Sequence, residues 1–105
     1  MAIPPLTSSQ AGVARQTDPL ADLRDAANRT VMNKDFEADV PAPTQVDYKK
    51  GLSLTVSQKD QREHGVVSRT AFDVEGQLYI QDTVMKSNGD TQELWKRGKR
   101  ALHAP

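Results

Sequence analysis

The residues best suited to acid–base or metal chemistry stand together in a polar stretch near the middle of the chain. Asp60, Glu63 and His64 are close neighbours there, and an imidazole beside carboxylates can hold a metal ion or transfer protons. Neighbouring residues of one polar loop do not converge on a point, and no second ligand-rich segment completes a site. The other histidine, His103, belongs to the C-terminal tail. We therefore expect a solvated loop at 58–65 and no site.

Two further groups of carboxylates carry no stronger signal. Asp22 and Asp25 fall on the solvent side of a predicted helix, and Asp35, Glu37 and Asp39 alternate along a predicted linker. The second spacing resembles a calcium loop superficially, but it lacks the mid-loop glycine and the bidentate glutamate. The chain has no cysteine and no glycine-rich phosphate cradle. We predict no catalytic residue, no metal and no cofactor, and hence a protein that is not an enzyme.

A basic cluster near the C-terminal end is the one concentrated charge feature. Trp95 is followed by four cations, Lys96, Arg97, Lys99 and Arg100. Such residues can grip a phosphate backbone while the indole stacks on a base. The formal net charge of zero and the lack of another basic stripe weigh against this use, because cations also protect an edge strand. A nucleic-acid-binding module is therefore an alternative hypothesis.

The clearest regular element is an amphipathic helix over about 19–32. Asp18 can accept hydrogen bonds from the first amides of a helix, and Pro19 has no amide hydrogen to satisfy. Apolar residues then recur at helical spacing, and this stripe is the predicted partner-binding face: Leu20, Leu23, Ala27 and Val31. So narrow a stripe must dock on something to persist. A regulatory protein that binds a partner through this helix is a second alternative.

Beyond residue 48 the apolar period changes from helical to two, which is typical of half-buried strands. Turn signals at Glu75 and Gly76, and at Asn88 and Gly89, divide this part of the chain. We expect a four-stranded antiparallel meander with strands at about 52–56, 66–74, 77–86 and 91–97. Gly98 is expected to end the last strand.

Two-residue turns at these places predict the register of the sheet. The first turn sets Arg69 opposite Asp82, and the second sets Asp82 opposite Trp95. One face then carries Val67, Ala71, Leu78, Ile80, Val84 and Trp95, and the other carries Val66, Phe72, Val74, Tyr79, Met85 and Leu94. Because neither face is polar, the sheet should be covered on both sides, by the helix and by a partner or a second copy. A bulge at Glu75 and Gly76 would instead move one strand's residues across the sheet.

The predicted fold class is α+β, and its parts differ in character. An N-terminal arm that is disordered or extended comes first, and its residues 1–17 show no hydrophobic periodicity. The other predicted parts are the amphipathic helix at 18–33, a proline-containing linker at 34–47, the antiparallel β domain at 48–98 and a basic tail at 99–105.

The composition favours association with other chains. Only 36% of residues are apolar and 5% are aromatic, so the core should be thin, and no disulfide or metal is available to reinforce it. We predict a structural or interaction protein, a small subunit of a homo- or hetero-oligomeric assembly such as a virion, tail or secretion-type particle. The arm and β domain would contact neighbours. With no signal peptide and no membrane span, cytoplasmic synthesis precedes incorporation into the particle.

Overall fold

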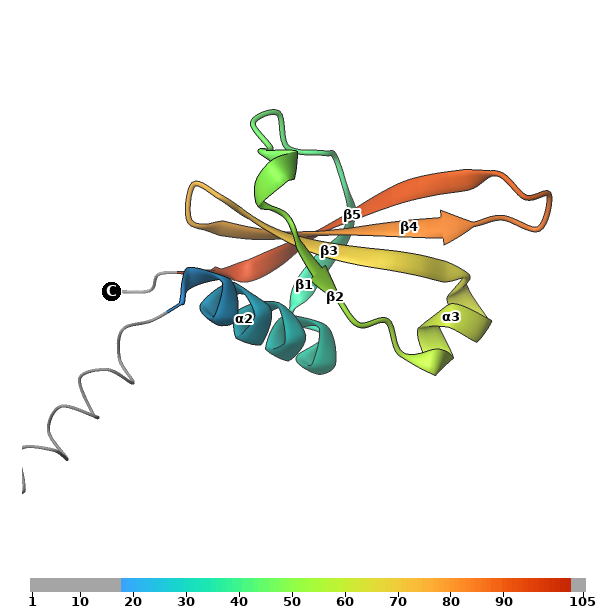
Figure 1. Ribbon diagram of the computed structural model, residues 1–105, viewed down its shortest axis with the longest axis horizontal. Coiled ribbons are helices and arrows are strands. Elements are labelled where there is room, and N and C mark those ends of the chain that lie inside the picture. Colours follow the sequence, from blue (N-terminus) through green and yellow to red (C-terminus); the bar gives the residue numbers. More distant parts are fainter. Residues whose placement is uncertain (1–17, 103–105) are drawn as a thin grey trace, which may run out of the picture.

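The computed structural model describes residues 18–102, which form an α+β fold with one antiparallel sheet. The sheet has five strands in the order β1-β5-β4-β3-β2, and two α-helices lie below it in Figure 1. The predicted fold class is confirmed, but the prediction of four strands is wrong by one. The predicted arm at 1–17 and the end of the predicted tail, including His103, lie outside the described residues.

Helix α2, Pro19–Asn33, follows the predicted signals closely. The Asp18 side chain accepts a hydrogen bond from the Leu20 amide at 3.0 Å, and proline occupies the first turn. Lys34 ends the helix in the left-handed region at φ 55°, where its amide reaches the carbonyls of Thr30 and Val31. The helix therefore begins and ends through local backbone chemistry.

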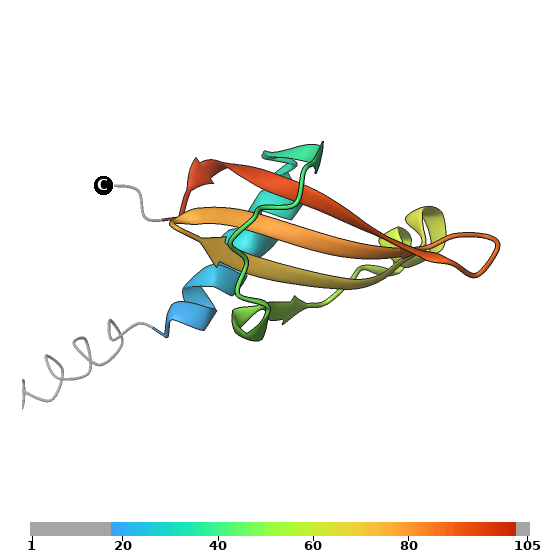
Figure 2. The ribbon, with the colours of Figure 1, turned by 90° about the horizontal axis from the view of Figure 1, so that it is seen from above.

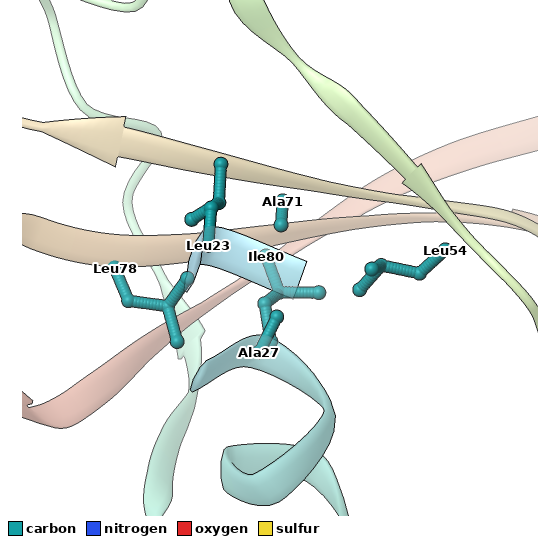
Figure 3. Close-up of a cluster of buried hydrophobic side chains, with 6 residues drawn as sticks. All are labelled: Leu23, Ala27, Leu54, Ala71, Leu78 and Ile80. Carbon is teal, nitrogen blue, oxygen red and sulfur yellow. The ribbon is translucent and has the colours of Figure 1, made fainter. Parts of the chain in front are cut away.

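The hydrophobic core lies between α2 and the sheet. Leu23 and Ala27 pack there against residues from strands β2, β3 and β4 (Figure 3). Val31, Leu52 and Leu102 are partly buried around this cluster. The core residues are Leu23, Ala27, Leu54, Ala71, Leu78 and Ile80.

Two elements occupy segments for which the sequence predicted irregular structure. Strand β1, Phe36–Val40, pairs with β5 inside the predicted linker. Helix α3, Gln58–His64, replaces the predicted loop. Its first turn is fixed by the Ser57 hydroxyl, which accepts from the Asp60 amide at 3.1 Å. Gly65 ends it at φ 69°, a conformation that glycine adopts without strain.

The chain crosses the whole sheet between β1 and β2, which form its opposite edges. The crossing segment, residues 41–51, passes over the face away from α2 (Figures 1 and 2). It includes a short 3₁₀ turn, Tyr48–Lys50, before strand β2, Leu52–Leu54. The chain itself therefore passes over the second face of the sheet, and cover by a partner or a second copy stays a prediction.

The three long strands form the centre of the sheet. They are β3, Val66–Val74, β4, Gln77–Met85, and β5, Thr91–Ala101. Gly98 does not end β5, contrary to the prediction, because the strand packs closely there: a Cβ on Gly98 would lie 3.3 Å from Leu78. Lys99 continues the strand and donates its amide to Asp35 at 3.1 Å, so the predicted basic tail begins inside the sheet.

The register is as predicted over Ser68–Val74 of β3 but not between β4 and β5. At the start of β3 the prediction is wrong, because Val66, and not Val67, lies opposite Val84. Arg69 lies opposite Asp82, as expected, whereas Asp82 lies opposite Leu94 and not Trp95. The cause is a three-residue loop, in which Lys86 donates to the Asp90 carbonyl and Gly89 takes φ 92°. A one-residue change of register moves every following side chain to the other face.

The two faces therefore differ from those predicted. The helix face, below the sheet in Figure 1, carries Lys96 as well as Arg69 and Asp82. The aromatic face carries Trp95 beside Phe72 and Tyr79. The pairing of β3 with β4 is irregular between Val66 and Ser68; Val66 is buried, while Val67 is 52% exposed.

Candidate binding groove

A groove of about 410 Å³ lies on the helix face beyond the end of α2. Its lining residues come from the end of α2, from α3 and from the sheet between them. We call it the interhelical groove. Its apolar wall consists of Val31, Phe36, Val66, Val84 and Leu94.

Local structure in several strands brings this wall together. The irregularity in β3 allows Val66 and Arg69, three residues apart, to line the groove together. The three-residue loop between β4 and β5 sets the register in which Val84 and Leu94 both line it. Phe36 reaches it from β1, across β5 from the other strands. The apolar wall thus depends on contacts between segments far apart in sequence.

The floor of the groove carries a buried ion network. Asp82 is only 1% exposed and receives two hydrogen bonds from Arg69, Nε to Oδ1 at 2.7 Å and Nη2 to Oδ2 at 3.0 Å. Lys96 Nζ lies 2.6 Å from Oδ2 of the same carboxylate. Asp60 of α3 pairs with the remaining Arg69 nitrogen, Nη1, at 3.2 Å. The network ties α3 to three strands and contains two cations and two carboxylates.

These contacts keep the network ionised. Burial by itself raises the pKa of Asp82, but hydrogen bonds from Arg69 and Lys96 outweigh that effect, so the pKa lies below its ordinary value of 3.8. The hydrogen bond to Asp82 raises the pKa of Arg69, against the smaller opposing effect of burial. Because each charge faces an opposite one, the floor offers no free base or nucleophile.

The rim of the groove differs from its floor. Lys34 and His64 are exposed there, and neither side chain has a hydrogen bond or ion pair to another described residue. Phe36 contributes its ring, 5.6 Å from Lys96 Nζ, which is within range of a cation–π contact. A ligand in the groove would therefore meet an apolar wall, a neutralised floor and unused hydrogen-bond donors at the rim.

The structure separates the residues of the predicted nucleic-acid site. Trp95 is 4% exposed on the aromatic face, its ring centroid 5.6 Å from that of Phe72, so it presents no stacking surface. Lys96 pairs with Asp82 on the helix face, Arg97 pairs with Glu37 at 2.7 Å and Arg100 pairs with Asp35 at 3.0 Å. Lys99 follows on the same strand. Trp95 and Lys96 therefore lie on opposite faces of the sheet, and three of the four cations are paired with carboxylates.

The predicted partner-binding stripe of α2 contacts the protein's own sheet. Leu23 and Ala27 are 6% and 0% exposed in the core, and Val31 packs beside them. Leu20, at 47%, is the exposed member. A partner would reach Leu23 and Ala27 only if the helix left the sheet, whereas Val31 also lines the interhelical groove.

The sequence predicted one contact of the groove, the Arg69–Asp82 pair, but not the groove itself. Asp60 and His64 were assigned to a solvated loop. Ser57, three residues before Asp60, is a helix-start signal that would have placed both on α3. Within residues 18–102, no group of three or more histidines and carboxylates could hold a metal ion.

No protein-family model, curated protein or solved structure matches this chain. Of the helices described here, none is both long and apolar enough to cross a membrane. The interhelical groove therefore has to be interpreted from its own chemistry.

Proposed function

We propose that the protein is a small interaction subunit of a multi-chain assembly and that the interhelical groove is where it binds a further copy of itself. This subunit would be made in the cytoplasm and incorporated into a particle such as a virion, tail or secretion-type complex. The proposal needs no enzymatic step and no cofactor.

One observation carries the proposal: the groove combines a partly exposed apolar wall with an ion network that is already neutralised. Phe36, Val84 and Leu94 line the groove and remain partly exposed. Covering such side chains with a partner gains free energy in proportion to the apolar area removed from water. The partner need not supply a charge to the floor, because Asp82 is already paired with Arg69 and Lys96.

The test is the mass of the full chain in solution as a function of concentration. We expect the wild-type mass, measured by sedimentation velocity, to rise between micromolar and submillimolar concentrations. Leu94→Asp places a charge in the apolar wall and should abolish that rise. Gln92→Asp is the matched control, since residue 92 is exposed on the same strand.

Two results would overturn the proposal. One is a wild-type chain that stays monomeric throughout the range. The other is equal loss of association in Leu94→Asp and Gln92→Asp, which would assign the effect to added charge and not to the groove. Circular dichroism of both variants establishes that each remains folded.

A further inference from the structure

We infer that the occupant of the interhelical groove is a segment of the chain's own N-terminal region, residues 3–6, supplied by a second copy. The inference rests on the proposed function and names the segment that the groove receives. Residues 3–6 are Ile3, Pro4, Pro5 and Leu6.

The first argument is apolar match. Among residues 1–17 this segment alone places two large aliphatic side chains close together, with the remainder mostly small or polar. The groove volume of about 410 Å³ falls within the range of sites that enclose small ligands. Val84 and Leu94, which are partly exposed, offer an aliphatic surface on which Ile3 and Leu6 can be buried.

The second argument is the balance of hydrogen-bond donors and acceptors. Pro4 and Pro5 have no amide hydrogen, so the segment has carbonyl acceptors at every residue but few donors. The groove has the opposite balance. The carboxylates of Asp60 and Asp82 already accept from Arg69 and Lys96.

The rim of the groove supplies donors that are not yet used. The Lys34 ammonium and the His64 imidazole stand at the rim without a partner among the described residues, and both can donate to a carbonyl. Recognition of proline-containing extended segments by apolar grooves follows the same logic, because such a segment loses little entropy and needs few hydrogen-bond acceptors.

The third argument is reach. Eleven residues lie between Leu6 and Asp18, and the twelve steps from one to the other span at most about 40 Å when the chain is extended. The groove lies at the far end of α2, whose 15 residues measure about 22 Å. The connecting chain is thus longer than the helix it must pass, so it can carry residues 3–6 as far as a groove at that distance. That the groove belongs to a second copy follows from the proposed function.

The experiment compares the full-length wild type with the full-length double variant Ile3→Ser/Leu6→Ser. Methyl NMR reports on Val66, Val84 and Leu94 in the groove, with Leu54 and Ile80 of the core as internal controls. We expect the double variant to shift the groove methyls and leave the core methyls unchanged. A synthetic peptide of residues 1–9, added to the variant, should restore the wild-type shifts. The same peptide with both serine substitutions should bind at least about tenfold more weakly.

Sedimentation of the same samples separates this inference from the proposed function. Groove shifts together with loss of association in the double variant support both. Unmoved groove methyls with association intact overturn the inference and leave the proposed function standing. The double variant can also shift the groove methyls while the wild type is monomeric at every concentration. The segment then binds the groove of its own molecule, which overturns both the role of a second copy and the proposed function. Unmoved methyls in a monomeric wild type overturn both.

Discussion

The two faces of the sheet are both covered by the chain, but by different kinds of structure and to different extents. On the helix face α2 seals the core and then ends at Asn33, which leaves the interhelical groove open beyond it. On the aromatic face an irregular segment crosses from edge to edge, and Phe72 and Trp95 are 3% and 4% exposed beneath it. The straight helix α2 covers only the part of the sheet that lies along its axis, whereas the irregular segment 41–51 runs across the sheet from one edge strand to the other. The open surface is thus on the face with the regular cover.

The largest predicted effect concerns the ion network of the groove floor. Asp82→Asn should lower the free energy of unfolding by about 3–5 kcal/mol, because it leaves Arg69 and Lys96 buried without their carboxylate. Urea unfolding at neutral pH measures this loss. Glu37→Gln is the control, since it removes an ion pair with Arg97 that is well exposed, and it should cost less than about 1 kcal/mol. Equal losses in the two variants would show that the floor is not buried.

The same network predicts how stability depends on pH. The pKa of Asp82 is lowered in the folded protein, so the unfolded chain takes up its proton first. The stabilisation is present above the unfolded pKa and is lost as pH falls through the folded pKa, beginning below about pH 5. Urea unfolding over a pH series should therefore show a shallower acid decline in Asp82→Asn than in wild type. A steeper decline in the variant would contradict the assignment.

An intermediate effect is expected where the crossing segment meets the aromatic face. A Cβ on Gly51 would lie 2.6 Å from Phe72 Cε1 and 2.7 Å from Thr70 Cγ2. Gly51→Ala should therefore cost about 1–3 kcal/mol through overpacking, since its φ of −68° suits alanine. Lys50→Ala, at the exposed neighbouring position, should change stability by less than about 0.5 kcal/mol. Wild-type stability in Gly51→Ala would mean that the segment does not seat on Phe72.

The smallest effect belongs to the apolar wall of the groove. Val84 is partly exposed, so the hydroxyl of a Val84→Thr variant can reach water. We expect thermal unfolding to show a loss within about 0.5 kcal/mol. If the free energy of unfolding falls by more than about 2 kcal/mol, the threonine hydroxyl is buried without a hydrogen-bond partner. That result would mean that the groove is closed to water.

The sequence predicted those elements whose signals are local. Asp18, Pro19 and the apolar spacing that follows fix α2, and a two-residue turn at Glu75 and Gly76 fixes the pairing of β3 with β4. The local signal for α3 was also present, in Ser57 and Gly65, but the polar character of the intervening residues obscured it.

The remaining features depend on contacts that no short window of sequence contains. Phe36–Val40 is a strand because residues 95–98 of β5, distant in sequence, offer it a partner. The face on which Trp95 lies was decided by one extra residue in the loop before Thr91. The groove forms only when β1 pairs with β5, the register between β4 and β5 is the observed one, α2 ends at Asn33 and α3 lies beside the sheet. The sequence pattern therefore identified only its Arg69–Asp82 pair.

The most direct test of the difference between the two faces is paramagnetic attenuation of NMR signals by a soluble gadolinium chelate. The sample is the full-length Ile3→Ser/Leu6→Ser variant, in which the proposed occupant is weakened. We predict strong attenuation of the Val84 and Leu94 methyls, with the Trp95 indole and the Ile80 methyls protected. Two results would contradict the account. One is that the groove methyls are protected to the same degree as the Ile80 methyls. The other is that the Trp95 indole is attenuated as strongly as the exposed ring of Tyr48.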